Sequence, residues 1–299
     1  VMMAESKAGQ LCRSLGFSEI ITYSFVSPTI FDNIRIPKDS ALRNAMRIQN
    51  PLGEDTSIMR TIALPSMLDI LARNYAYHNK NVKLYELAKI YLPTEGQALP
   101  AEPKMLTLGT YGEGTSFFTL KGQLEAILTG LRLPKATFTA VKDNPSYHPG
   151  RCAAVSMNGE LLGYMGQVHP LVAKTYGLDT EVYCVEIDFS KAFTMMLPEA
   201  TFTPLPKYPA VTRDLSLLCD EATTIAELTD VITAAGGKLL RRVDLFDIYR
   251  GKGVAEGKKS VAFSLVLRAD DRTLTDADSE GVTKKVLAAL ESKLGATLR

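Results

Sequence analysis

A short proline-rich segment divides this sequence into two parts of unequal length. Within residues 197–209, four of thirteen positions are proline: Pro198, Pro204, Pro206 and Pro209. Proline lacks the backbone N–H that helices and sheets use, and closely spaced prolines keep a chain extended. No helix or central strand can therefore run through this segment, and we predict two domains, residues 1–200 and 201–299.

The second part predicts a small domain in which strands and helices follow a definite order. Glu227 follows Thr224 by three positions, and Asp278 follows Thr275 in the same way, which is the pattern of a capping box at a helix start. The order β-α-β-β-α-β is that of a ferredoxin-like domain, with both helices on one face of the sheet. The predicted strands are 211–219, 239–250, 259–268 and 296–298, and the helices are 224–235 and 276–294.

The first part predicts a larger and mostly antiparallel α/β domain. Asn158-Gly159 is a strong hairpin signal, and the helices do not alternate regularly with the strands, which argues against a doubly wound parallel sheet. The whole chain is therefore expected to be α+β. The predicted helices are 2–15, 64–77 and 117–131, and the strands are 19–26, 45–49, 82–92, 105–111, 136–141, 152–157, 160–167 and 181–188.

Composition excludes several classes of protein. The formal net charge is +1, so the chain lacks the strong positive field of a non-specific nucleic-acid binder. Its four cysteines contain no CxxC pair, and its three histidines lack ligand spacing, so we expect free buried thiols in the cytoplasm and no metal site. No apolar run approaches the roughly 20 residues that cross a membrane. Residues 1–7 have no signal-peptide pattern and lead directly into a predicted helix, as expected for a piece of a longer polypeptide.

Motifs for catalysis are largely missing from the sequence. His148-Pro149-Gly150-Arg151 could supply a base and an anion clamp, but we favour a type II turn whose His148 and Arg151 bond nearby backbone. Arg60 could bind a phosphate or carboxylate, although a structural ion pair is the simpler interpretation. The acids between 270 and 278 fit no calcium loop and suit the positive end of a helix dipole.

The second part resembles the ferredoxin-fold anticodon-binding domain that ends the beta subunits of bacterial phenylalanyl-tRNA synthetases. The resemblance rests on five ordered blocks: 208–215 (YPAVTRDL), 245–249 (LFDIY), 257–263 (GKKSVAF), 271–276 (DRTLTD) and 295–299 (GATLR).

The first part resembles the synthetase-like domain that precedes it in the same subunits. The matching residues are 16–19 (GFSE), 50–52 (NPL), 59–61 (MRT), 85–87 (YEL), 148–151 (HPGR), Gly163, Gly166 and 169–170 (HP).

The resemblance implies a class II synthetase-like antiparallel sheet that does not catalyse. The complete family enzyme is an α2β2 assembly that uses ATP and Mg²⁺ to charge tRNA-Phe, with its active site in the alpha subunit. Residues 1–197 contain no Gly-rich, Arg-bearing stretch of the kind that holds ATP. We therefore expect no catalytic residue and no cofactor in this chain, and contact with the alpha subunit through helices such as 2–15 and 64–77.

The open face of the second domain is the expected RNA-binding surface. Alternation along 259–268 places Val261 and Phe263 toward the helices and small side chains on the open face, where a base could lie. Alternation along 239–250 places Phe246, Ile248 and Arg250 on that face, unless a bulge reverses the assignment for Asp247 and Tyr249. The candidate RNA-binding residues are Arg213, Arg242, Phe246, Tyr249, Arg250, Lys258, Ser260 and Arg268.

Two other functions stay open at this point. The aromatic residues could belong to a core or a protein interface, which would make the chain a protein–protein interaction module without direct RNA contact. An independent enzyme would have to use His148 and Arg151, whereas we expect these two residues and Arg60 to support the fold or a subunit interface. The basic residues between 241 and 259 cluster around one hairpin, so a local RNA site is compatible with a neutral chain.

Overall fold

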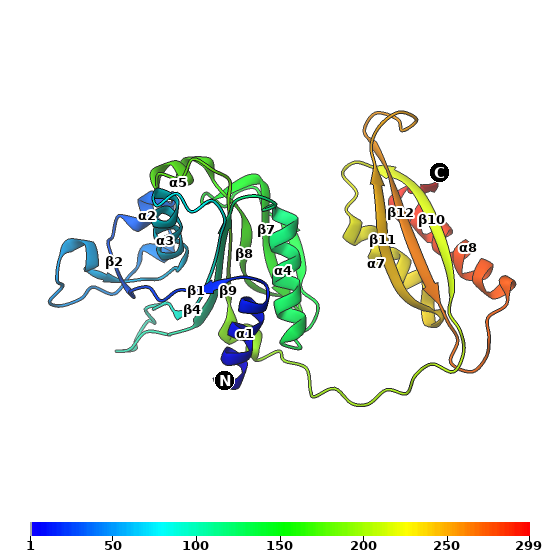
Figure 1. The fold of residues 1–299 in the computed structure, drawn as a ribbon, viewed down its shortest axis with the longest axis horizontal. Coiled ribbons are helices and arrows are strands. Elements are labelled where there is room, and N and C mark those ends of the chain that lie inside the picture. Colours follow the sequence, from blue (N-terminus) through cyan, green and yellow to red (C-terminus); the bar gives the residue numbers. More distant parts are fainter. Residues whose placement is uncertain (1) are drawn as a thin grey trace. The chain divides into compact units, whose positions relative to one another are not determined.

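The computed structural model describes residues 2–299, and the chain forms two compact units, Val1–Glu199 and Ala200–Arg299 (Figure 1). Residues 197–207 are exposed and form no helix or strand.

The first unit is built on a sheet in the order β1-β4-β5-β9-β8-β7-β6, in which β1 and β4 are parallel and the other neighbours are antiparallel. A second, two-stranded sheet pairs β2 with β3. The strands are β1 Ser18–Glu19, β2 Phe25–Val26, β3 Ile58–Met59, β4 Val82–Lys89, β5 Lys104–Tyr111, β6 Thr137–Ala140, β7 Tyr147–Met157, β8 Glu160–Val168 and β9 Val182–Asp188. The helices are α1 Met2–Ser14, α2 Ile30–Asn33, α3 Leu64–Ala76, α4 Phe117–Gly130, α5 Pro170–Thr175 and α6 Phe189–Phe193, with short 3₁₀ turns η1 Ala41–Arg43 and η2 Glu54–Thr56.

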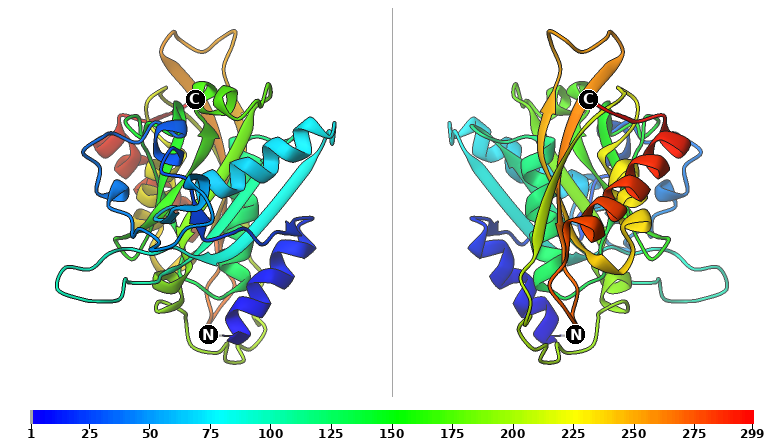
Figure 2. Two further views of the ribbon diagram at one scale, coloured as in Figure 1. Left: turned by 90° about the vertical axis from the view of Figure 1, so that its left-hand side faces the viewer. Right: turned by 90° about the vertical axis from the view of Figure 1, so that its right-hand side faces the viewer.

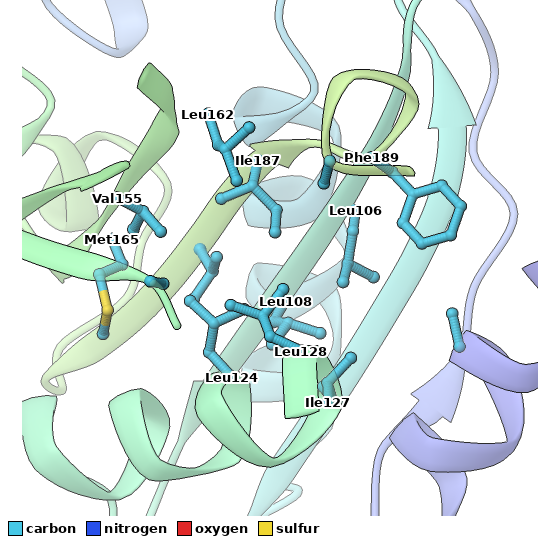
Figure 3. Packing of buried hydrophobic residues seen from close by; sticks show 14 of the residues in the cluster. Leu106, Leu108, Leu124, Ile127, Leu128, Val155, Leu162, Met165, Ile187 and Phe189 are labelled. Carbon is cyan, nitrogen blue, oxygen red and sulfur yellow. The ribbon is translucent and has the colours of Figure 1, made fainter. Parts of the chain in front are cut away.

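Both faces of the large sheet are covered, so this unit has two apolar cores. On one face α1 and α4 pack on the strands, and Figure 3 shows Leu124 and Ile127 of α4 beside Leu106 and Leu108 of β5. On the other face α2, α3 and α5 cover the sheet (Figure 1), and the fully buried Leu68 and Leu71 of α3 contribute to the second core. Because both faces are covered, all but one residue of β5 and all but one of β9 are buried.

The predicted strand 19–26 is wrong in extent, because the chain forms only β1 and β2 there. The physical reason is Glu86 of β4, whose Oε1 accepts both the backbone N–H and the hydroxyl of Thr22 at 2.7 Å, in place of a sheet hydrogen bond. The predicted strand 45–49 is reduced to one bridge between Arg47 and Ile58. Helices α2, α5 and α6 were not predicted, since each is too short to show a helical period.

The expected type II turn at Pro149-Gly150 is also wrong. These residues lie within β7, where the register with β8 shifts between Tyr147 and Cys152, and Gly150 does not adopt the positive φ of that turn. The N–H of Gly150 instead donates to Nδ1 of His148 at 3.0 Å, so the segment is an irregularity inside a strand. The neighbouring Asn158-Gly159 turn does have the two positive φ angles of a tight hairpin.

The second unit has the predicted β-α-β-β-α-β order and the sheet order β11-β12-β10-β13. Thr224 and Thr275 form the two predicted capping boxes with Glu227 and Asp278. The connection between β11 and β12 extends beyond the rest of this unit (Figure 2). The strands are β10 Val211–Asp220, β11 Leu240–Tyr249, β12 Lys258–Leu267 and β13 Thr297–Leu298, and the helices are α7 Ile225–Gly236, the 3₁₀ turn η3 Gly237–Leu239 and α8 Asp276–Leu294.

A bulge in β11 changes which side chains face the open side of this sheet. The register with β12 shifts between Leu245 and Asp247, which leaves Phe246 as the extra residue. Beyond it, Tyr249 lies opposite Ser260 on the open face, and Ile248 lies opposite the core residue Val261. The simple alternation was therefore wrong for Ile248, and the bulged alternative is the one that the structure adopts.

Candidate functional site

A buried ion pair joins the residue that follows β3 to β4 of the large sheet. Nη1 of Arg60 lies 3.3 Å from Oε2 of Glu86, and their side chains are only 1% and 3% exposed. Nη1 also donates to the hydroxyl of Thr22 at 2.7 Å, and Nε donates to the carbonyl of Lys89 at 3.0 Å. Arg60 therefore forms an ion pair inside the protein, and its guanidinium group has several hydrogen-bond partners there.

A second buried carboxylate lies on the same face of the sheet. Glu186 of β9 accepts the backbone N–H groups of Ala63 and Leu64 at 2.8 and 3.0 Å, at the N-terminus of α3. Burial raises the pKa of Glu186 to about 7, against the lowering effect of these two hydrogen bonds. Thr107 lies between Glu86 and Glu186 in the register, and its buried hydroxyl has no hydrogen-bond partner among the described residues.

Arg151 takes part in a different cluster, at the edge of the first unit. Its Nη1 donates to Gln167 and to Glu181, both at 2.8 Å, and the hydroxyl of Tyr183 donates to Glu181 at 2.6 Å. The hydrogen bond from Tyr183, followed by that from Arg151, lowers the pKa of Glu181. Arg151 thus bonds side chains rather than the expected backbone, while His148 does bond backbone. The structure does not bring Arg60 together with this cluster.

Residues 2–299 contain no group of three or more His, Cys, Asp or Glu side chains placed to hold a metal ion. All four cysteines are free and buried, as predicted, and burial raises the pKa of Cys152 to about 12. Across the described chain, no helix combines the length and apolarity that a membrane span requires.

Several small side chains lie beside one aromatic ring on the open face of the second unit. Ser216 of β10 and Ala262 of β12 are register partners on this face, and the hydroxyls of Ser216 and Ser260 lie 3.4 Å apart. Tyr249 is 39% exposed, and its hydroxyl donates to the carbonyl of Lys252 at 3.2 Å. Leu218 of β10 lies opposite Ser260 on the same face, so the small side chains form a limited patch that includes Ser216 and Ala262.

Most candidate cations of this unit are already paired with carboxylates. Arg250 donates to both oxygens of Glu221, which lowers the pKa of Glu221. The remaining pairs are Arg242 with Asp244 at 2.6 Å, Lys258 with Asp220 at 2.6 Å and Arg213 with Asp276 at 2.8 Å. An anionic ligand would have to compete with these acids.

The other candidates occupy different places in the unit. Arg213 lies on the helix side, where it also donates to Ser279 of α8 at 3.0 Å, so it does not face the small side chains. Phe246 sits in the bulge and is 59% exposed. Arg268 follows β12, and its Nε is buried without a partner among the described residues.

Three residues of these clusters were not predicted from the sequence. Glu86 and Glu186 are single acids inside apolar strands, a pattern that signals a buried charge with a partner elsewhere. Arg299, whose guanidinium lies over the ring of Tyr249, carries no local signal because the contact joins distant parts of the chain.

Comparison with known proteins matches both units. Residues 2–189 match the model of the phenylalanyl tRNA synthetase beta chain CLM domain, and residues 206–299 match that of the ferredoxin-fold anticodon binding domain. A phenylalanine–tRNA ligase beta subunit of Clostridium acetobutylicum is 44% identical over 96% of this chain and 36% of its own length, and that of Clostridium tetani is 42% identical over 99% and 37%. The chain thus spans somewhat more than a third of the length of these relatives.

The fold alone is also similar to a class II synthetase structure. Pyrrolysyl-tRNA synthetase from Desulfitobacterium hafniense superposes with a TM-score of 0.54 at 13% identity, covering 64% of this chain and 68% of that one.

Proposed function

The chain belongs to the phenylalanyl-tRNA synthetase beta chain family, and on that premise we propose that it serves an α2β2 phenylalanine–tRNA ligase in two ways. The first unit supports the catalytic alpha subunit, and the second unit binds the anticodon region of tRNA-Phe. ATP and Mg²⁺ are used by the complete enzyme, in its alpha subunit.

The open face of the second unit is the observation that carries the RNA proposal. Unstacked bases bind to π surfaces, and the partly exposed ring of Tyr249, beside Ser260 and Ala262, provides one. Because the unit is nearly neutral, its affinity for RNA should depend on such a local site rather than on a long-range field.

A gel shift with this chain tests the RNA proposal. We expect the chain to bind a tRNA-Phe transcript more tightly than a transcript whose anticodon bases are changed, and Tyr249→Leu to reduce that difference. Equal binding of both transcripts would contradict anticodon recognition. No binding of either would favour the alternative, a protein–protein interaction module.

An exposed apolar stretch supports the proposed contact with the alpha subunit. Ile21, Tyr23 and Phe25 are 92%, 83% and 45% exposed and occupy alternate positions from the end of β1 to the first residue of β2. Apolar patches of this kind usually mark protein interfaces. By contrast, the apolar face of α3 is already buried in the core, so we no longer propose that helix as the contact.

Co-purification with an alpha subunit tests this second role. We expect the chain to bind it and the double variant Ile21→Asp/Tyr23→Asp to lose binding, while Leu99→Asp, also at an exposed position, keeps it. Because the proposed role is non-catalytic, ATP–pyrophosphate exchange with phenylalanine by this chain alone would contradict it.

A further inference from the structure

The first unit contains a cavity at its large sheet, beside the start of α3. Its volume is about 210 Å³, and its walls come from strands β5, β7, β8 and β9, from the start of α3 and from the turn η1. Two of the lining residues, Leu42 of η1 and Ile62 before α3, are only half-buried, so the cavity lies close to the surface. Because η1 belongs to no sheet, a local opening there admits a small molecule without breaking strand pairing.

Most of the cavity wall is apolar. Five of its thirteen lining residues are leucine or isoleucine, one is Met105, and two are Tyr147 and Tyr164. An empty space of this kind is costly, because the side chains around it lose packing contacts on one side. A cavity of about 150 Å³ lined by apolar side chains binds benzene. The volume of about 210 Å³ therefore accommodates one substituted six-membered ring.

Tyr147 brings a hydroxyl without a hydrogen-bond partner to this wall. The residue is only 4% exposed, yet no hydrogen bond joins its hydroxyl to any of residues 2–299. By contrast, the hydroxyl of Ser146 donates to the carbonyl of Ile34 at 2.7 Å, and Glu186 accepts the two N–H groups at the start of α3. The described chain has three unpartnered hydroxyls that are completely enclosed, and that of Tyr147 is not one of them, so a group in the cavity can reach it. A buried hydroxyl without a partner costs free energy, which a hydrogen-bonding ligand would recover.

The groups that line the cavity favour a neutral ligand over a charged one. Glu186 is one of the lining residues, so an anion would meet a carboxyl group there. Both oxygens of that carboxyl already accept backbone N–H groups, at 2.8 and 3.0 Å, and an ammonium group would lose its hydration among apolar walls. A neutral hydroxyl loses less on entering the cavity, and one hydrogen bond to Tyr147 compensates that loss.

We propose that this cavity binds a small neutral molecule, a monocyclic phenol, with its ring among the apolar side chains and its hydroxyl hydrogen-bonded to Tyr147. The ring fills the empty volume, and the hydroxyl supplies the partner that Tyr147 lacks. An aromatic ring suits the wall, because the sulfur of Met105 and the tyrosine rings both make favourable contacts with aromatic rings. Neither RNA nor another subunit takes part, so the inference is independent of the proposed function.

The test titrates the 299-residue chain with p-cresol and follows the methyl signals of isotope-labelled methionines by NMR. Met105 lines the cavity, whereas Met157 and Met165 belong to the core on the other face of the sheet. We expect p-cresol to shift the Met105 signal in a saturable way, with a Kd of about 1 mM or lower. Toluene, which is the same molecule without the hydroxyl, should bind more weakly.

Three variants separate the ring from the hydroxyl. Tyr147→Phe should weaken p-cresol binding about tenfold, as for one lost hydrogen bond, and leave toluene binding unchanged. Leu42→Trp places a larger side chain at the cavity and should abolish the binding of both compounds. The matched control is Tyr85→Phe, which removes the hydroxyl of a buried tyrosine on the other face of the sheet and should leave both affinities unchanged.

Three outcomes would overturn the inference. No saturable shift of the Met105 signal would mean that the cavity does not take up the ring. Equal shifts of Met105, Met157 and Met165 would mean that p-cresol binds apolar surface without preference. Equal affinities of the wild type and Tyr147→Phe for p-cresol would mean that the hydroxyl is not recognised. If Leu42→Trp does not fold, the comparison of Tyr147→Phe with Tyr85→Phe decides by itself.

Discussion

At the scale of residues, the first unit contains a buried ion pair whose two members depend on each other. Arg60 and Glu86 are desolvated together, and each is stabilised by the other and by hydrogen bonds to Thr22. Removing one member leaves the other as an unpaired charge in a low-dielectric interior, which costs more than the pair itself contributes.

We therefore expect Arg60→Met to reduce the free energy of unfolding of the first unit by about 3–5 kcal/mol. The double variant Arg60→Met/Glu86→Leu should recover part of this loss, since it removes both charges. The control Lys89→Met breaks the exposed pair with Glu102 and should cost about 1 kcal/mol or less. Urea unfolding of the four proteins checks this, and equal losses for Arg60→Met and Lys89→Met would refute it.

Glu186 gives the first unit a pH-dependent stability. Its pKa of about 7 in the folded chain lies above the ordinary value of 4.5, because burial disfavours the charged form. The folded state then holds the proton more tightly, so the contribution of Glu186 is fully present below about pH 4.5 and is lost as the pH rises through 7.

The contribution of Glu186 can be isolated by comparing the unfolding free energies of the wild type and a variant without this carboxyl group. The difference in unfolding free energy between the wild type and Glu186→Gln should change with pH between 5 and 7, in the direction of lower wild-type stability at higher pH. Chemical denaturation at several pH values measures it. A difference that stays constant over this range would show that Glu186 does not titrate there.

At the scale of elements, the pairing of β8 with β9 depends on a glycine. Gly163 has a φ of 158°, and a Cβ there would lie 2.0 Å from the carbonyl oxygen of Glu186. Because the obstacle is the backbone of the next strand, no side-chain movement can relieve the clash. The strand register itself therefore requires glycine at this position.

Gly163→Ala should accordingly destabilise the first unit by about 2 kcal/mol or more, as expected for overpacking against backbone. The control Gly122→Ala adds the same methyl group within α4, where nothing lies within 4 Å, and should stabilise the chain by about 0.5–1 kcal/mol. Thermal and urea unfolding of both variants measure the contrast. Similar effects of the same sign would contradict the role of the close strand contact.

At the scale of the whole molecule, the two units have separate cores and are joined by an exposed segment without helix or strand. Such a segment is a preferred site of proteolysis. Brief trypsin treatment should therefore cut after Lys207, and Lys207→Gln should abolish that cut. The fragment that begins at Tyr208 should keep the thermal unfolding transition of the second unit, and loss of that transition on cleavage would show that the two units depend on each other.

Local interactions explain what the sequence by itself determined. The proline-rich segment, the capping boxes at Thr224 and Thr275 and the Asn158-Gly159 turn act within a few residues, so they predicted the division of the chain, the β-α-β-β-α-β order and the main hairpin. Alternation in β12 likewise predicted the core side of Val261 and Phe263.

The tertiary structure decided the features that depend on contacts between distant residues. The carboxylate of Glu86 interrupts a strand at Thr22, the bulge at Phe246 turns Tyr249 to the open face, and acids on neighbouring elements pair with most of the candidate cations. The guanidinium of Arg299 reaches the ring of Tyr249 only because the folded chain brings β13 and β11 into one sheet. Hydrogen bonds and charges act over a few ångströms in space, and residues that are 50 or more positions apart become neighbours only when the chain has folded.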